Sequence, residues 1–386
     1  MISSLSKHKV PLLDLAALHA PVREEIIAEM IRVVDSQKFI MGDDVREFEQ
    51  LMADYSGTQF AIGCASGSDA LLLALMAADV GPGDRVLTTP YTFFATAGSI
   101  SRVGAIPVFA DIDPLTFNLD AEAAARALKT DPGIKALIPV HLFGGCADMD
   151  PLLESAREFG CTVIEDGAQS IGAEYKGRKA QSMGHIGCIS FFPSKNLGAF
   201  GDAGMLTTDD ADLARKIGSL RLHGTTKKYH HEWVGINSRL DTLQAAILKV
   251  KFRWLDAWTA GRQRNAALYR SLLSASNLPL QLPRETEYQT RHIYNQFVIR
   301  VPHRDRLKQW LQENGIGTEV YYPLPLHLQP CYQKLGYREN DFPVSELAAR
   351  QTLALPVHSA MSNQDIEYVA QMIIDFFVHE IGPASA

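Results

Sequence analysis

The chain has 386 residues, of which 46% are hydrophobic and 21% are charged, a composition that supplies a buried core and argues against disorder. The 37 basic and 44 acidic residues give a formal net charge of −7, which argues against a protein that grips a nucleic-acid backbone. No apolar stretch approaches the about 20 residues of a membrane helix and no signal peptide is recognisable, so we expect no membrane contact and a cytoplasmic location.

Short apolar or β-branched runs alternate with helical stretches from about Val86 to Thr208. This alternation predicts β-α units that build a mainly parallel, buried sheet. Open α/β sheets bind ligands outside the carboxyl ends of their strands, so we expect functional residues along that edge. The predicted strands are Val86–Leu87, Ile106–Phe109, Ala136–Pro139, Cys161–Ile164, Cys188–Phe192 and Gly204–Thr207.

A long helical pattern begins after Asn237 and extends to about Leu273, with an expected break near Gly261. Beyond it, Tyr294–Val301 and Gly317–Tyr322 are predicted strands of a second, α+β unit. The length also fits one large and one smaller domain. The predicted domains are residues 1–255 and residues 256–386, joined by the long helix.

Several chemistries lack their sequence signals. The five cysteines are scattered and form no C-x-x-C pair, so we expect neither a disulfide framework nor a zinc site. His223, His230 and His231 lie close together, but no H-E-x-x-H or carboxylate spacing accompanies them, and no metal is expected. The Walker, G-x-G-x-x-G and G-x-S-x-G motifs are absent, which disfavours ATP, NAD and α/β-hydrolase chemistry.

Two carboxylates, Glu165 and Asp166, end one predicted strand. A carboxylate at this position can point into a ligand cleft, where a buried Asp could stay ionised against a protonated ring nitrogen. The simpler interpretation of an isolated Asp here is the N-cap of a following helix.

Lys195 directly follows another apolar strand. Loss of solvation there would lower the pKa of its amine and suit it to Schiff-base chemistry. The glycines at 198, 201 and 204 would let the backbone pass close to a flat ligand. A solvated surface lysine is the simpler interpretation of an isolated residue, but the surroundings favour the chemical one.

Two further segments carry ligand-binding features. Gly63–Leu71 places Ser66 and Ser68 before an apolar helix, a start that favours an anion such as a cofactor phosphate, although simple N-capping explains the serines equally well. Phe93 and Phe94 follow a predicted strand and offer faces for stacking on a planar ring. Core packing is the more common fate of such residues, although only one of the two can point inward on a strand.

Together these segments supply an anion site, a stacking face, a partner for a ring nitrogen and a lysine, which are the parts that pyridoxal phosphate requires. Over nearly its whole length the chain resembles the DegT/DnrJ/EryC1/StrS family of nucleotide-sugar aminotransferases, which have fold type I of the pyridoxal-phosphate (PLP) enzymes. The matching stretches are Ala65–Leu71, Thr92–Thr96, Glu165–Ser170, Ser190–Lys195, His223–Gly224 and Gly235–Ala246.

The resemblance implies an α/β fold, with a mainly parallel seven-stranded sheet in the large domain and a smaller α+β C-terminal domain. It implies that Lys195 is the Schiff-base lysine, that Asp166 partners the pyridinium nitrogen and that Gln169 lies against the hydroxyl side of the ring. Phe93 would stack on the ring. The implied phosphate contacts are Gly67, Ser68, Ser190 and, from the neighbouring subunit of a homodimer, Asn237.

The implied reaction is transamination of a nucleotide-linked keto-sugar, with glutamate as amino donor, for surface polysaccharides or natural products. Implied sugar contacts are Arg239, Tyr321 and His327. The nearest analogy is a UDP-linked 3-oxo-glucuronate, and dTDP-linked 3-oxo or 4-oxo deoxysugars are the alternatives. Sugar dehydration is disfavoured because the dehydrating relatives replace the lysine with histidine, and a regulatory, non-catalytic role is disfavoured by the intact cofactor positions.

Overall fold

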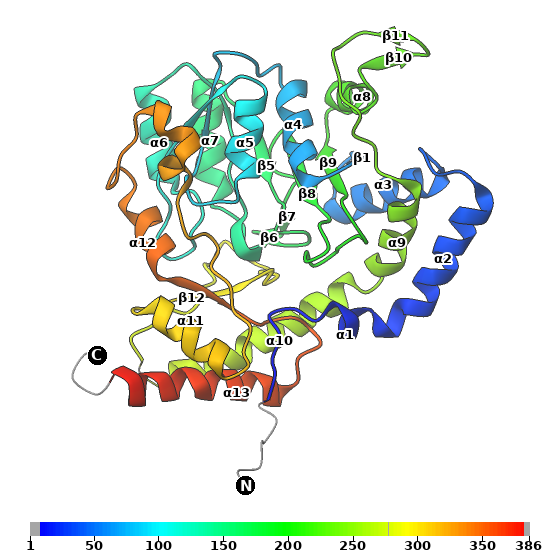
Figure 1. The fold of residues 1–386 in the computed structure, drawn as a ribbon. Helices are drawn as coiled ribbons and strands as arrows, with labels where there is room; N and C mark the ends of the chain where they lie inside the picture. Colours follow the sequence, from blue (N-terminus) through cyan, green and yellow to red (C-terminus); the bar gives the residue numbers. More distant parts are fainter. Residues whose placement is uncertain (1–7, 277, 382–386) are drawn as a thin grey trace.

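The computed structural model describes residues 8–276 and 278–381. Its centre is a seven-stranded sheet in the order β1-β9-β8-β5-β4-β2-β3, in which β9 runs antiparallel to both of its neighbours and the other pairs are parallel. Helices cover both faces (Figure 1). The strands are β1 (Phe60–Cys64), β2 (Arg85–Thr88), β3 (Ile106–Phe109), β4 (Ile134–Leu137), β5 (Thr162–Asp166), β8 (Ile186–Ser190) and β9 (Gly204–Thr208).

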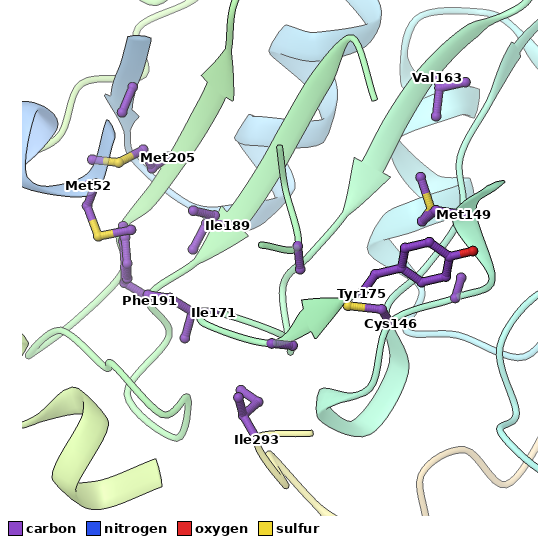
Figure 2. Close-up of a cluster of buried hydrophobic side chains, with 14 of the residues drawn as sticks. Met52, Cys146, Met149, Val163, Ile171, Tyr175, Ile189, Phe191, Met205 and Ile293 are labelled. Carbon is purple, nitrogen blue, oxygen red and sulfur yellow. The ribbon is translucent and has the colours of Figure 1, made fainter. Parts of the chain in front are cut away.

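The strands are buried on both faces because successive side chains point to opposite sides. Within β5, Val163 joins the cluster under one set of helices and Ile164 joins the cluster under the other. Figure 2 shows the first cluster, where Val163, Ile189 and Met205 lie along the sheet. This face is covered by α3 (Asp43–Ser56), α6 (Ala121–Thr130), α7 (Met149–Phe159) and α9 (Thr242–Phe252), and the other by α4 (Gly67–Ala77), α5 (Ala95–Arg102) and α8 (Ala211–Leu220).

The second unit surrounds a separate apolar cluster at the opposite end of the molecule from the β10–β11 hairpin (Thr225–Lys227 and His230–His231) (Figure 1). A capping box formed by Ser362 and Asp365 starts its last long helix. Val10, near the start of the described chain, packs into this cluster and pairs with Ile316. The unit contains α10 (Leu255–Ser274), α11 (Arg304–Glu313), α13 (Asn363–Asp375) and the antiparallel pair of β12 (Phe297–Arg300) and β13 (Thr352–Leu355).

The chain crosses between the two units more often than the predicted boundary at residue 255 suggests. Val10 belongs with the C-terminal unit, although residues 1–255 were expected to form the large domain. In the other direction, Leu326, Tyr332 and Phe342 pack on Ala97 of the large unit. The segment that carries them includes η3 (Leu326–Leu328), η4 (Pro330–Leu335) and α12 (Pro343–Gln351).

Three details of the elements differ from the expectations. β1 was not predicted. The expected strand Gly317–Tyr322 is irregular, and Glu319 makes only an isolated bridge to Ala354. The expected helix break near Gly261 is wrong, because α9 ends at Phe252 and α10 continues through Gly261 to Ser274.

Candidate active site

A cavity of about 360 Å³ opens at the carboxyl ends of β5 and β8, beside the start of α4. It brings together residues that lie more than 250 positions apart in the sequence. Eight of the predicted site residues line it: Gly67, Ser68, Phe93, Asp166, Gln169, Ser190, Lys195 and Tyr321.

Lys195 lies in the turn that follows β8, where its N–H donates to Phe192 O over 2.9 Å. The side chain is partly buried and lines the cavity together with Asp166. Burial lowers the pKa of the Lys195 amine to about 8, while the nearby charge of Asp166 opposes this shift. The solvated-surface interpretation of Lys195 is therefore wrong, and a fraction of the amine is unprotonated near neutral pH.

Asp166 ends β5 and is almost fully buried at the floor of the cavity. Its Oδ2 accepts a hydrogen bond from the Thr96 hydroxyl over 2.7 Å, and its Oδ1 accepts the Ala168 N–H over 3.2 Å. A turn, and no helix, follows it, so the N-cap interpretation is wrong. The carboxylate is held at a fixed orientation in the cavity.

The start of α4 has the features of an anion site. Ser66 is the N-cap, since its Oγ accepts the Asp69 N–H over 3.1 Å. The preceding backbone N–H groups, those of Gly67 and Ser68, belong to the first turn, where no carbonyl of the helix can accept them. A Cβ at Gly67 would lie 2.6 Å from Cβ of Ser190, so only glycine lets α4 approach β8 this closely.

Phe93 and Phe94 lie in the loop between β2 and α5, after the strand that they were expected to follow. Phe93 lines the cavity, and 57% of its surface is exposed. Its ring centroid is 6.1 Å from that of Tyr322. Phe94 packs instead on Tyr332, with ring centroids 5.9 Å apart. Neither ring is in the core, and Phe93 remains available for stacking.

Gln169, which also lines the cavity, is oriented by two hydrogen bonds. Its Oε1 accepts the Phe143 N–H over 2.8 Å, and its Nε2 donates to the Tyr322 hydroxyl over 3.0 Å. The neighbouring Tyr321 is anchored through its carbonyl, which accepts the Tyr91 hydroxyl over 2.6 Å. Tyr322 and Thr96 were missed by sequence reasoning, although both lie inside segments that it quoted.

Three predicted residues do not line the cavity of their own chain. Asn237 and Arg239 flank Ser238, which is fully buried and donates to Asp69 Oδ2 over 2.7 Å at the base of the anion site. The side chain of Asn237 is exposed, and Arg239 is partly buried. His327 is buried away from the cavity, where its Nε2 lies 3.2 Å from Glu346 Oε1. The structure therefore gives His327 a place in the packing of the C-terminal segment.

The structure also bears on possible metal sites, membrane helices and disulfide bonds. Among the residues that the structure describes, no three His, Cys, Asp or Glu side chains gather in a way that could hold a metal ion. No described helix is long and apolar enough to cross a bilayer. All five cysteines are free thiols, and Cys331 alone is exposed.

The residues of the cavity fit pyridoxal phosphate. Lys195 would supply an amine for its aldehyde, Asp166 would supply a carboxylate for its ring nitrogen, and the N–H groups that begin α4 would supply a site for its phosphate. The missing Cβ of Gly67 lets the start of α4 lie directly against Ser190, which also lines the cavity. The fold and the cavity are those of a pyridoxal-phosphate-dependent enzyme.

The model of the DegT/DnrJ/EryC1/StrS aminotransferase family matches residues 21–374, and the chain belongs to this family. A pleiotropic regulatory protein of Geobacillus stearothermophilus is 48% identical over 96% of this chain and 99% of its own. A UDP-N-acetyl-3-dehydro-alpha-D-glucosamine 3-aminotransferase of Acidithiobacillus ferrooxidans is 43% identical over 94% and 97%. A UDP-2-acetamido-2-deoxy-3-oxo-D-glucuronate aminotransferase of Pseudomonas aeruginosa is 40% identical over 93% and 98%.

Solved structures agree with this assignment. DesV of S. venezuelae, in complex with a ketimine intermediate, has a TM-score of 0.92 and 38% identity over 96% of this chain and 99% of its own. NtdA of Bacillus subtilis, with bound cofactor PMP, has a TM-score of 0.86 and 30% identity over 94% and 85%. The chain is a PLP-dependent aminotransferase, and its fold is the one expected from the resemblance.

Proposed function

We propose that the chain transfers an amino group from glutamate to the 3-oxo carbon of a UDP-linked 2-acetamido sugar. The observation that carries the catalytic part is the shared cavity of Lys195 and Asp166, with the pKa of the amine lowered to about 8 by burial. The printed names of two relatives at 43% and 40% identity support the substrate, since both denote UDP-linked 3-oxo sugars with a 2-acetamido group.

The side chains divide the work as follows. Bound pyridoxal phosphate supplies an electron sink for the carbon that loses or gains the amino group. Lys195, with an amine that is partly unprotonated near neutral pH, accepts and returns a proton at the reacting carbon. Asp166 places its carboxylate where the ring nitrogen is expected, and the N–H groups that begin α4 hold the phosphate.

A homodimer with shared sites is part of the proposal. Asn237 precedes Ser238, which bonds to Asp69 in the first turn of α4, but Asn237 is exposed and does not line the cavity of its own chain. An apolar strip on α2 (Arg23–Ser36) and the segment after it is also exposed. Exposed strips of this kind mark protein–protein contacts. The strip consists of Ile27, Ile31, Val34, Phe39 and Ile40.

The reaction can be tested on purified protein loaded with pyridoxal phosphate. Glutamate should replace the visible absorbance of the bound aldehyde by that of its amino form, and a 3-oxo sugar should restore it. The panel contains UDP-linked 2-acetamido-3-oxo-glucose and -glucuronate, and dTDP-linked 3-oxo and 4-oxo deoxysugars. Restoration by a dTDP-sugar alone would overturn the proposed substrate, and no change with any donor would favour a regulatory role.

A further inference from the structure

Thr96 is fully buried in the first turn of α5, and its hydroxyl bonds to the carboxylate of Asp166. The Thr96 Oγ1 to Asp166 Oδ2 distance is 2.7 Å, and Oδ1 accepts the Ala168 N–H over 3.2 Å. Each carboxylate oxygen therefore has a partner from a different segment of the chain. The carboxylate cannot rotate without losing one of these two bonds.

The direction of these bonds follows from the groups involved. An ionised carboxylate only accepts hydrogen bonds, so the Thr96 hydroxyl donates to Asp166. Thr92 Oγ1 lies 3.1 Å from Thr96 Oγ1. Because the Thr96 hydroxyl has one hydrogen and donates it to Asp166, the Thr92 hydroxyl must be the donor in this second hydrogen bond. A relay thus runs from Thr92 through Thr96 to Asp166.

The relay begins in the segment that also carries the exposed ring of Phe93. The loop before α5 and the end of β5 both line the cavity, through Phe93 and Asp166, and within the relay Thr96 is the side chain that joins them. Thr96 is not among the described residues that line the cavity. Any effect of Thr96 on the cofactor must therefore pass through Asp166 or through the loop of Phe93.

We propose that Thr96 is a positioning residue that fixes the Asp166 carboxylate toward the ring nitrogen of pyridoxal phosphate. This inference rests on the proposed function, which gives Asp166 that partner. Charge-assisted hydrogen bonds are stronger than neutral ones, so the loss of this bond should be measurable in cofactor binding.

The test compares Thr96→Val, which keeps the shape, with Thr96→Ser, which keeps the hydroxyl. We expect Thr96→Val to raise the dissociation constant for pyridoxal phosphate about tenfold and to lower kcat for glutamate more than it changes KM. Thr96→Ser should stay within about threefold of the wild type. If the valine variant does not fold, Thr96→Ala compared with Thr96→Ser isolates the hydroxyl in the same way.

A double-mutant cycle separates positioning from packing. In an Asp166→Ala background the carboxylate is gone, so Thr96→Val should change cofactor affinity less than about twofold. An undiminished effect in that background, or a serine variant as impaired as the valine variant, would overturn the proposal. Failure of the proposed function would be seen separately, as wild-type protein that accepts no amino group from glutamate.

Discussion

Glu165 and Asp166 are neighbours at the end of β5, but their carboxylates lie on opposite sides of the sheet. Asp166 faces the cavity, whereas Glu165 is fully buried beneath it and lies 2.7 Å from His141 Nε2. Its Oε2 also accepts the Gln181 N–H, and its Oε1 accepts those of Met183 and Gly184. Because side chains alternate along a strand, Asp166 faces the cavity, whereas Glu165 binds the backbone of the loop that holds Gln181, Met183 and Gly184.

Replacing Glu165 should therefore affect stability. Burial alone would raise the pKa of Glu165, but the hydrogen bonds from His141 and from backbone N–H groups outweigh it and hold this pKa below its usual value. In Glu165→Gln one amide NH2 would face backbone donors, which should lower the free energy of unfolding by about 3 kcal/mol. Denaturant titration of the cofactor-free protein measures this change.

The pH dependence of the Glu165 contribution has a defined sign. A depressed folded-state pKa adds stability above the unfolded-state pKa, and this stability is lost as pH falls through the folded value. The wild type should therefore lose more stability below about pH 4 than Glu165→Gln does. Equal losses in the two proteins would contradict the structural role of the carboxylate.

The reactivity of Lys195 should follow its lowered pKa. The free amine attacks an aldehyde, so the rate at which cofactor-free protein captures pyridoxal phosphate should rise with pH and level off above about pH 8. A solvated lysine would show the same rise near pH 10.4. Stopped-flow absorbance measures the rate, and a midpoint near 10 would show that the amine is not desolvated.

Lys251 is a second buried lysine, with only 1% of its surface exposed. Its Nζ donates to Gly198 O in the loop after Lys195, and burial lowers its pKa to about 8. Keeping its charge buried costs roughly 3 kcal/mol below pH 8, and the cost disappears as pH rises toward the unfolded-state value. The stability of the cofactor-free protein should therefore rise between pH 8 and 10.

Lys251→Met should remove the part of this pH-dependent rise in stability that Lys251 contributes. Because Lys195 contributes a similar rise when no cofactor is bound, the comparison is made between Lys195→Ala and Lys195→Ala with Lys251→Met. The matched control is Lys249→Met, since Lys249 is paired with Asp44. A rise of unchanged size after the loss of Lys251 would disprove the assignment of the buried charge.

Shared sites in a homodimer can be tested by mixing two inactive variants. Lys195→Ala removes the amine, and Asn237→Asp would place a negative charge against the phosphate of the partner's cofactor. In a mixed dimer both lesions fall in one site and leave the other intact, so a refolded equal mixture should recover roughly a quarter of wild-type activity. Without recovery, Asn237 does not act across subunits.

The sequence predicted the parallel strands of the sheet because each contains a short β-branched or apolar run and these runs alternate with helical stretches. β1 was missed because Ala61 and Gly63 have low strand propensity and because β1 precedes the segment in which strands and helices were seen to alternate. Gly261 was taken as a helix break, yet it lies inside α10. A Cβ at this position would come within 2.5 Å of Ser359 Cβ, so the position requires glycine. Its role is close packing, which only the tertiary structure reveals.

The cofactor side of the site was predicted through motifs with a fixed local sequence, such as the segment from Ser190 to Lys195. The contacts of Thr96 and Tyr322 depend on segments that meet only in the fold, and no spacing along the chain encodes them. His327 shows the opposite case. Its segment resembles a substrate loop, but its ring is buried against Phe342.

The identity of the reactive lysine can be read directly by reducing the cofactor-loaded protein with borohydride and mapping the modified peptide by mass spectrometry. Lys251 is the matched competitor, because its amine is buried and its pKa is also lowered to about 8. The account predicts the reduced cofactor on the side chain of Lys195 and an unmodified Lys251. Modification of Lys251, or of no lysine at all, would contradict it.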